Sequence, residues 1–491
     1  MRRPLKAVSS VALVAVLAVT AAACGSSSKK AGTNTDTGGS VTAADCPVQA
    51  LTSYDASKGR IKVPLWYSLT GESKNALTEM AASYNKSQSK VTVQPQLVGK
   101  SYDEVLAKYL QGIPSKQLPA GAYIEDNKMQ TMVDSKTVVP GEACMEASGL
   151  SLATLYPSQA VRNYYTVQGV FYPAVLNVSE PILYYNKTLF KKAGLDPNKP
   201  PQTFAEIRAD ALALKKVGVS KPFAFKLDPW FIESWLGGEG VDVVNNGNGR
   251  TARATAATFA TPQLKQILTF WKQMQADGLI DVIPKTSGNI NQYLDLSSQK
   301  SAMLVETSTA ATNIKAFLGG TLKPSDLGVG GVPKDLKQIV PGAGPIPGVT
   351  TPGQARVSGG AFYIMNTTAP VVQAATWDFM KYMLQIQQQV KWHLQGSYLP
   401  AVKGVSADPQ VQNFWKTDLA GGMLKVGYDE LNSINPRHPG ALIGAYSDYE
   451  TALRKMLEGI YINGQSIDSA MSTAQSTATK AIDTYNQDNA N

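Results

Sequence analysis

Short apolar runs alternate with amphipathic segments along most of the chain. Residues 61–66 have the β-branched and aromatic composition of a strand, and apolar residues then recur every three or four positions between Ala76 and Tyr84. The same sequence of patterns follows at 91–95, which is strand-like, and at 105–110, which is helical. This order predicts α/β domains built on largely parallel sheets.

The later part of the chain adds helices and two glycine-rich stretches. Thr203 and Glu206 have the spacing of a capping box, and long helical patterns run over 371–387 and 449–460. Residues 245–250 and 341–353 are rich in Gly, Asn or Pro and predict surface loops.

The first 24 residues have the features of an export signal. Arg2, Arg3 and Lys6 form a positive start, and every residue of 11–23 except Thr20 is apolar. That run is shorter than the roughly 20 residues of a membrane-spanning helix and is typical of a signal peptide. Small residues before Cys24 resemble a bacterial lipobox, although Ala21 stands where leucine is usual. The sequence predicts a lipoprotein signal peptide over 1–23; cleavage at an ordinary small-residue site would instead give a freely secreted protein.

A polar stretch follows Cys24. Residues 25–39 are almost entirely Ser, Thr, Gly, Lys, Asn and Asp, which cannot bury a core. We therefore predict a flexible tether over 24–45, with lipid on Cys24 anchoring an extracytoplasmic protein to the cell membrane.

Charge and rare residues narrow the function further. The chain carries 46 Lys and Arg against 37 Asp and Glu, a formal net charge of +9. Three of these cations belong to the predicted signal peptide, and the rest are spread without basic clusters, so no nucleic-acid partner is expected. With only two His, a His-rich metal site is not expected, and no cofactor or metal is predicted.

The remaining cysteines are Cys46 and Cys144. In an oxidising compartment they form a natural disulfide pair once Cys24 carries lipid; the alternative is two buried free thiols.

Familiar catalytic patterns are missing. We find no Walker A loop, HExxH or GxSxG motif, and the SxxK match at 83–86 has no companion motif. Glu125 and Asp126 could serve a glycosidase, but adjacent acids usually mark a solvated loop. No catalytic residue is assigned, and the chain is predicted not to be an enzyme.

Several segments resemble the extracellular solute-binding proteins of ABC importers, and among these the glycerol-3-phosphate-binding branch of the sugar-binding family. The run 182–197, which begins ILYYNK and ends with AGLDP, is the most distinctive. Supporting segments occur in the family's order at 65–71 (LWYSLTG), 359–361 (GGA), 392–393 (WH) and 398–400 (YLP).

The resemblance implies the two-lobed α/β periplasmic-binding-protein fold, type II and similar to maltose-binding protein, with a multi-strand hinge. Lobe I would comprise 46–174 and 307–361, and lobe II 175–306 and 362–485, with crossings near Ala174, Glu306 and Ala361. A ligand in the cleft would close the lobes, and the closed monomer would dock on the transmembrane subunits of a permease.

The same resemblance implies a ligand site. Aromatic contacts fall at Tyr102, Tyr398 and Trp230, while Leu227 stands at a second stacking position without a ring. Asp126 would accept hydrogen bonds from ligand hydroxyls. Hydroxyl contacts match Ser179 and either Thr307 or Ser308, and Gly360 matches a close backbone approach. These residue types suit a sugar or polyol, because aromatic faces pack on C–H groups and polar groups satisfy hydroxyls.

One position departs from the glycerol-phosphate branch. Where that branch holds the phosphate with an arginine, the matching segment here places Glu450, although Arg437 or Arg454 could serve instead. A carboxylate at this point would repel a phosphate. The predicted ligand is therefore an uncharged carbohydrate or polyol.

Three alternatives stay open at this point. A glycerol-3-phosphate or glycerophosphodiester receptor, for example one for glycerophosphocholine, would use the same fold. A secreted glycoside hydrolase would need two opposed carboxylates. An envelope adhesion or scaffold protein would fit the tether and the basic charge.

Overall fold

The computed structural model describes residues 41–286, 291–318, 339–353 and 356–489, and the chain from Gly39 onward forms one compact unit. The predicted signal peptide, Cys24 and residues 24–40 of the predicted tether lie outside these ranges. The end of the predicted tether is ordered, since a 3-10 helix η1 (Ala43–Asp45) packs against the body. No helix in the described ranges is long and apolar enough to cross a membrane.

The first sheet has the strand order β2-β1-β3-β13-β4, and β7 also pairs with β13. β1 runs parallel to β2 and β3, whereas β13 runs antiparallel to β3, β4 and β7. The predicted strands at 61–66 and 91–95 are confirmed as β1 and β2. The six strands are β1 (Ile61–Tyr67), β2 (Val91–Leu97), β3 (Gly121–Glu125), β4 (Val138–Val139), β7 (Val175–Ser179) and β13 (Ser358–Met365).

The second sheet has the order β10-β9-β11-β8-β12. β9 runs parallel to β10 and β11, while β8 runs antiparallel to β11 and β12. Both sheets are therefore mixed rather than largely parallel. The strands of the second sheet are β8 (Pro181–Asn186), β9 (Phe223–Leu227), β10 (Ile280–Pro284), β11 (Met303–Thr307) and β12 (Pro341–Gly344). A separate hairpin joins β5 (Thr166–Val167) to β6 (Val170–Phe171).

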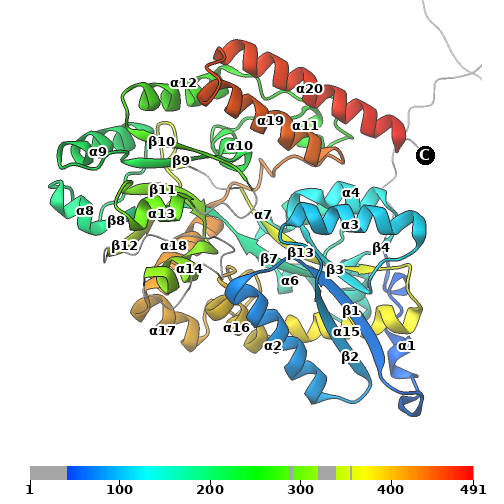
Figure 1. Ribbon diagram of the computed structural model, residues 1–491. Helices are drawn as coiled ribbons and strands as arrows, with labels where there is room; N and C mark the ends of the chain where they lie inside the picture. The colour runs from blue at the N-terminus through cyan, green and yellow to red at the C-terminus, as the bar shows by residue number, and fades with distance from the viewer. Residues whose placement is uncertain (1–40, 287–290, 319–338, 354–355, 490–491) are drawn as a thin grey trace, which may run out of the picture. The chain divides into compact units, whose positions relative to one another are not determined.

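Each sheet with its covering helices forms one lobe, which gives the predicted two-lobed α/β fold (Figure 1). The first lobe contains η2 (Ala56–Lys58), α1 (Gln49–Thr52), α2 (Gly71–Ser87), α3 (Tyr102–Ser115), η3 (Asp126–Lys128), α4 (Met129–Asp134), α5 (Gly141–Ala147), α6 (Leu152–Leu155), α7 (Gln159–Tyr165), α15 (Pro370–Met383) and α16 (Ile386–Gly396). The second contains α8 (Lys187–Lys192), α9 (Phe204–Lys216), α10 (Pro229–Gly238), α11 (Asn245–Gly249), α12 (Pro262–Ala276), α13 (Asn291–Ser297), α18 (Leu419–Ser433), α19 (Tyr446–Tyr461) and α20 (Ile467–Asp488). Between them, α14 (Ala310–Leu318) contacts α2 and α18, and α17 (Pro409–Thr417) contacts α16 and α18.

Strand alternation explains how β8 joins two apolar cores. Leu183 and Tyr185 point to the core of the second lobe, whereas Ile182 and Tyr184 belong to the core that continues into the first lobe. All six residues of β8 are buried, as expected for a strand covered on both faces.

Among the described residues, the chain passes between the sheets in three places. The first passage is at Glu180, between β7 and β8, and the second lies between the end of β12 at Gly344 and the start of β13 at Ser358. The third lies between α16, which packs on α2, and α18, which packs on β8 and β12. These connections form the multi-strand hinge of the fold.

Strand pairing distributes some segments differently from the predicted lobe ranges. β7 belongs to the first sheet, so the chain crosses after Ser179 rather than near Ala174. β12, within the range 307–361 predicted for lobe I, pairs with β8 of the second sheet. Conversely, α15 and α16 lie in the range 362–485 predicted for lobe II, but they pack on the first sheet and on α2.

Local predictions fare unevenly. The Thr203–Glu206 capping box at the start of α9 is confirmed. The single helix predicted over 371–387 is wrong, because extended backbone at Gln385 separates α15 from α16. The surface loop predicted over 341–353 is wrong for β12, whose backbone pairs with β8. The surface loop predicted over 245–250 is confirmed as irregular backbone, since Asn246, Gly247 and Asn248 are left-handed, but Asn248 and Gly249 are buried rather than at the surface.

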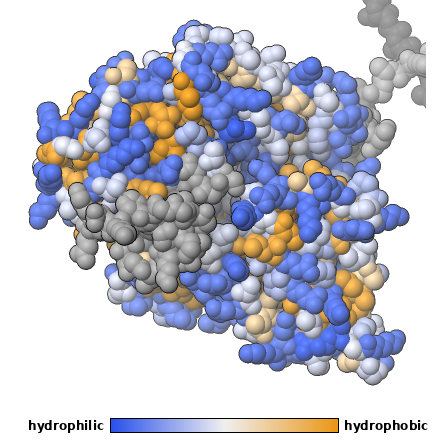
Figure 2. Space-filling model, in the orientation of Figure 1, coloured by the Kyte–Doolittle hydropathy of each residue, from blue (hydrophilic) through white to orange (hydrophobic). Residues whose placement is uncertain are grey.

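The surface drawn in Figure 2 is mostly hydrophilic, with apolar residues in separate small patches. Large apolar side chains that are exposed include Leu97, Leu212, Ile386 and Ile462, which lie on different elements. Scattered single residues of this kind are normal on a soluble protein surface.

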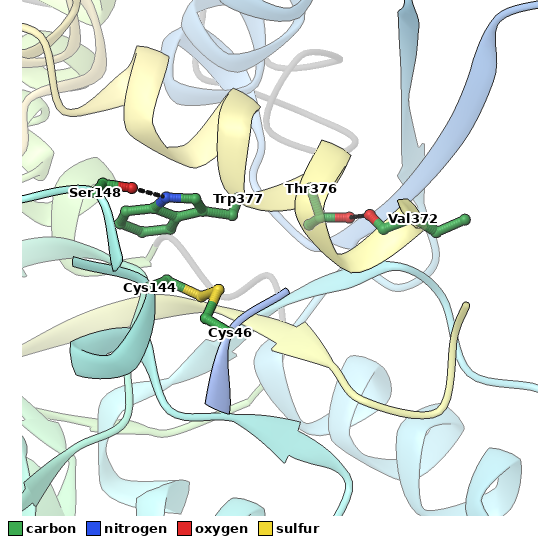
Figure 3. The surroundings of a disulfide bond; sticks show 6 residues. All are labelled: Cys46, Cys144, Ser148, Val372, Thr376 and Trp377. Carbon is green, nitrogen blue, oxygen red and sulfur yellow. Dashed lines mark hydrogen bonds between the residues drawn. A yellow bond between two sulfur atoms is a disulfide. The ribbon is translucent and has the colours of Figure 1, made fainter. Parts of the chain in front are cut away.

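The predicted disulfide is confirmed: Cys46 and Cys144 are bonded, which fastens the segment after η1 to α5 (Figure 3). The indole of Trp377 on α15 belongs to the surroundings of this bond and donates to Ser148 Oγ at 2.7 Å. The start of the body is thereby held against the first lobe.

We expect the Cys46→Ser/Cys144→Ser variant to lose about 4–5 kcal/mol of unfolding free energy, because the bond closes a long loop. The sequence separation of the two cysteines is 98 residues. Urea denaturation of the variant and the wild type measures the loss. Equal stability of the two chains, or two free thiols by mass spectrometry of the native protein, would contradict the prediction.

Candidate functional site

A cavity of ≈ 200 Å³ lies where the two lobes meet. Strand ends deliver most of its lining, because β3, β7 and β11 end there and the chain enters α10 directly after β9. In open α/β sheets, ligands generally bind in the crevice at the carboxyl ends of the strands. The lining residues are Tyr102, Glu125, Asp126, Asn127, Ser179, Asp228, Trp230, Lys285, Glu306, Thr307, Thr309, Arg356, Ser358, Gly359, Tyr398, Tyr446 and Glu450.

The structure brings seven of the predicted ligand residues to this cavity. They come from both lobes and are Tyr102, Asp126, Ser179, Trp230, Thr307, Tyr398 and Glu450. Their convergence from distant parts of the sequence makes the cavity the candidate site.

Three predicted residues do not line it. Leu227 is fully buried in the core of the second lobe. The Ser308 hydroxyl accepts from the Glu180 amide, so it joins the residue after β11 to the hinge connection at Glu180. Gly360 faces Tyr123, whose hydroxyl oxygen would lie 2.5 Å from an added Cβ, and the neighbouring Gly359 lines the cavity instead.

Three tyrosines form a hydrogen-bonded row in the first lobe. The Tyr123 hydroxyl lies 2.9 Å from those of both Tyr102 and Tyr398. Tyr398 also stacks on Trp392, with ring centroids 5.3 Å apart and 5° between the planes. Burial raises the pKa of each of the three phenols, so the row is neutral and presents two aromatic rings to the cavity.

His393 holds the backbone beneath this row. Trp415 donates its indole N–H to His393 Nε2 at 2.8 Å, which leaves the ring proton on Nδ1, 2.8 Å from the Tyr398 carbonyl. Burial lowers the pKa of His393 to about 4, so the ring stays neutral in this tautomer at ordinary pH.

Asp126 is a buried carboxylate at the end of β3. Tyr164 donates its hydroxyl to Oδ2, and the Gly359 amide donates to Oδ1 at 3.2 Å. Burial raises the pKa of Asp126 to about 6, although these hydrogen bonds and the Arg356 charge oppose the shift. The carboxylate is therefore oriented before a ligand arrives and remains charged at neutral pH.

Glu450 is held by cations from both lobes. Lys285 of the second lobe lies 2.5 Å from Oε1, and Lys128 of the first lobe lies 3.6 Å from Oε2. Burial raises the pKa of Glu450, but Lys285 and Lys128 lower it further than burial raises it. The neighbouring ammonium groups, which also pair with Asp228 and Glu125, thus weaken the predicted repulsion between Glu450 and a phosphate.

The remaining acids of the second lobe are also paired. Asp228 lies 3.0 Å from Lys285 and 3.4 Å from Lys226, and Lys226 lies 3.1 Å from Glu306. Lys226 and Lys285 lie at the ends of neighbouring strands and neutralise the negative charge of the acids around them. Such pairing is needed because an unpaired buried charge is costly.

Arg356 is the cavity residue that sequence reasoning missed most clearly. Its guanidinium lies 2.7 Å from Glu233 and 3.1 Å from the Tyr446 hydroxyl, and it is 6% exposed. Its Nε and the indole N–H of Trp230 are buried without a hydrogen-bond partner in the described residues. Arg356 follows a Gly/Pro-rich stretch without periodicity, so no pattern indicated it.

Lys285, Glu306 and Asp228 were missed as well, although each stands at or just after the end of a strand. A search for polar residues at strand ends would have found them. Within the described ranges no group of three or more His, Cys, Asp or Glu residues could hold a metal ion.

A larger groove of ≈ 1020 Å³ runs along α14, α16, α17 and α18. Exposed side chains such as Lys315, Gln387 and Leu419 line it. Ile339 and Val340, the first residues of the described range 339–353, border it. We prefer the smaller cavity because buried polar groups of both lobes converge there.

We expect the folded chain to lose stability between pH 6.5 and pH 4 through His393. The ring takes up a proton near pH 6.5 in the unfolded chain but only near pH 4 in the folded chain. This difference in pKa corresponds to a loss of roughly 3 kcal/mol in the free energy of unfolding. Urea denaturation at pH 7 and pH 4.5 measures the change. The His393→Gln variant removes the proton site and should lose less stability over this interval; an identical loss in both proteins would contradict the assignment.

Comparison with known proteins agrees with this architecture. A model of the family described as bacterial extracellular solute-binding protein matches residues 79–418. The sn-glycerol-3-phosphate-binding periplasmic protein UgpB of Pectobacterium atrosepticum is 24% identical over 436 residues, which are 88% of this chain and 94% of that protein.

Solved structures share the fold. UgpB of Mycobacterium tuberculosis, in complex with glycerophosphocholine, matches with a TM-score of 0.69 and 17% identity over 87% of this chain and 100% of that chain. The cyclic alpha-maltosyl-1,6-maltose binding protein of Arthrobacter globiformis matches with a TM-score of 0.68 and 18% identity over the same shares. Because the family model spans more than half of the sequence, this chain belongs to the bacterial extracellular solute-binding proteins.

Proposed function

We propose that this protein captures a carbohydrate or polyol in the interlobe cavity and delivers it to the transmembrane subunits of an ABC importer. It acts as a monomer, held at the outer side of the cell membrane by lipid on Cys24. It binds its ligand without a cofactor and without chemical change. Its curated relatives carry the names of binding proteins, which supports this proposal.

The observation that carries the proposal is the convergence of aromatic rings and oriented polar groups from both lobes on one cavity. Tyr102 and Tyr398 approach from the first lobe and Trp230 from the second. Aromatic faces pack well on the C–H faces of a sugar ring.

Hydroxyl groups of such a ligand find partners in the same cavity. Asp126 accepts hydrogen bonds, while Thr307 and Ser179 donate or accept. The unpartnered N–H of Trp230 supplies a further donor. Buried polar groups are costly when they lack a partner, so a ligand that satisfies them gains affinity over an apolar molecule of equal size.

Closure follows from the distribution of these contacts. A ligand that touches Asp126 in the first lobe and Trp230 in the second gains its full binding energy only when the lobes are together. Ligand binding thereby favours the closed form over an open one, which gives a permease a shape to recognise.

We expect Trp230→Ala and Asp126→Asn each to weaken ligand binding by about tenfold or more, through lost ring packing and a lost charged acceptor. A thermal-shift screen of mono-, di- and oligosaccharides, polyols and glycerophosphodiesters identifies the ligand, and calorimetry then compares the variants.

Tyr54→Ala, a partly buried tyrosine on the first lobe away from the cavity, is the matched control and should bind normally. Unchanged affinity in both cavity variants would remove this site assignment. Release of shortened products from an oligosaccharide would instead indicate a glycoside hydrolase.

Arg356 favours a second candidate, a receptor for glycerol-3-phosphate or a glycerophosphodiester. Its guanidinium lines the cavity and keeps one N–H without a partner in the described residues, and guanidinium groups bind phosphate well. The named ligands of UgpB relatives belong to this class.

For a phosphate-containing ligand we expect Arg356→Lys to lower affinity by about tenfold, because lysine keeps the charge but loses the planar donor geometry. Calorimetry with glycerol-3-phosphate, glycerophosphocholine and an uncharged sugar from the screen measures the selectivity. An equal loss for the uncharged sugar would show that Arg356 acts through the Glu233 ion pair alone, and the second candidate would fail.

A further inference from the structure

Outside the cavity, two arginines that follow α11 reach from the second lobe to the first. The guanidinium of Arg250 donates to three carbonyls at the end of α7, with Nη1 lying 2.8 Å from Tyr164 O, 3.2 Å from Thr166 O and 3.3 Å from Asn163 O. On its own lobe it donates to Gly440 O at 2.9 and 3.1 Å.

The chemistry of this contact is that of a helix C-terminus. The last carbonyls of α7 lack partners within the helix, and a cation placed there interacts favourably with the helix dipole. Arg250 comes from a different lobe, so its hydrogen bonds to these carbonyls exist only while the lobes are together.

Arg253 makes the second bridge. It forms a two-pronged ion pair with Asp134 at the end of α4, at 2.7 and 3.2 Å, and its Nε donates to Asn486 on α20 at 2.8 Å. Figure 1 shows α4 of the first lobe near α11 and the C-terminal end of α20. Paired N–H···O bonds of this kind are among the stronger surface ion pairs.

Neutral hydrogen bonds accompany the arginines. Thr131 Oγ1 donates to Gly444 O at 2.9 Å, and Asn163 Nδ2 donates to Pro436 O at 3.2 Å. Arg250, Arg253 and these partners are all absent from the cavity lining. They hold the lobes together without touching a ligand.

We propose that Arg250 and Arg253, with Asp134 and the carbonyls at the end of α7, form an arginine clasp that favours lobe closure before a ligand binds. Arg250 is also a positioning residue. Its guanidinium lies 5.4 Å from the ring of Tyr164, whose hydroxyl donates to Asp126 in the cavity. Closure of the clasp and orientation of Asp126 are thereby linked through one side chain.

The clasp lowers the free energy of the closed form in the absence of ligand, so less ligand binding energy is spent on closure. This inference depends on the two-lobed fold and not on the identity of the ligand. Its test therefore needs no ligand, and its failure leaves the proposed function intact.

The test measures the distance between the two lobes in the exported, ligand-free protein by pulsed electron paramagnetic resonance. Spin labels go on Lys86→Cys in α2 and Lys216→Cys in α9, both exposed and on different lobes. Cys46 and Cys144 are bonded and do not take label. The Arg250→Gln/Arg253→Gln variant should raise the ratio of open to closed molecules by about tenfold, seen as a longer distance.

Arg208→Gln is the matched control, because it removes an arginine ion pair with Asp277 that lies within the second lobe. It should leave the distance unchanged, and Arg250→Lys should restore closure in part. If the double variant does not fold, Asp134→Asn removes the ion pair alone and should still lengthen the distance. A distribution like that of the wild type in whichever of these clasp variants folds would overturn the proposal.

Discussion

The interface between the lobes depends on the compensation of buried charge around Glu450. This carboxylate lies between Lys285 of the second lobe and Lys128 of the first, and Lys128 is 1% exposed. An ammonium so deeply buried is costly without a partner, and its acids are Glu125 beside it and Glu450 across the cavity. Separation of the lobes would move Glu450 away from Lys128 and leave this ammonium with one acid fewer. The same charges that make the cavity polar therefore also hold its two walls together.

Two different kinds of contact therefore join the lobes. Inside the cavity, ion pairs leave room for a ligand among aromatic rings and oriented acceptors. Outside it, Arg250 and Arg253 bridge to α7 and α4 with no ligand between them. Tyr164 connects the two regions, since it stacks near Arg250 and donates to Asp126. Tyr164 thus connects the interlobe contact of Arg250 to the Asp126 carboxylate in the cavity, so a ligand that bound Asp126 as proposed would be coupled to lobe closure.

Patterns that are local in sequence predicted much of the fold. The prediction of the site was less complete, because some of its residues are placed by contacts with residues far away in the sequence. Residue patterns identified β1 and β2, the Thr203–Glu206 capping box marked the start of α9, and the family resemblance led to Tyr102, Asp126 and Trp230 in the cavity. Arg356 was out of reach because it stands in an aperiodic loop, and its place depends on Glu233 and Tyr446 from two other helices. β12 was taken for a loop because its residues, PGAG, have no strand composition; pairing with β8 makes them a strand.

The revised role of Glu450 bears on ligand class. Taken alone, a carboxylate at this position argues against a phosphate, because like charges repel strongly in a partly dry site. With Lys285 at 2.5 Å and Lys128 at 3.6 Å, the charge of the carboxylate is partly compensated, and its repulsion of a phosphate is weaker than that of an isolated carboxylate. Arg356 is likewise compensated by Glu233, which weakens its attraction for an anion. The argument that Glu450 repels a phosphate and the argument that Arg356 attracts one are therefore both weakened, and the proposed ligand class depends mainly on shape, ring packing and unpartnered donors such as the indole N–H of Trp230. Those features favour a neutral, hydroxyl-rich molecule, for which no net charge has to be moved into the cavity.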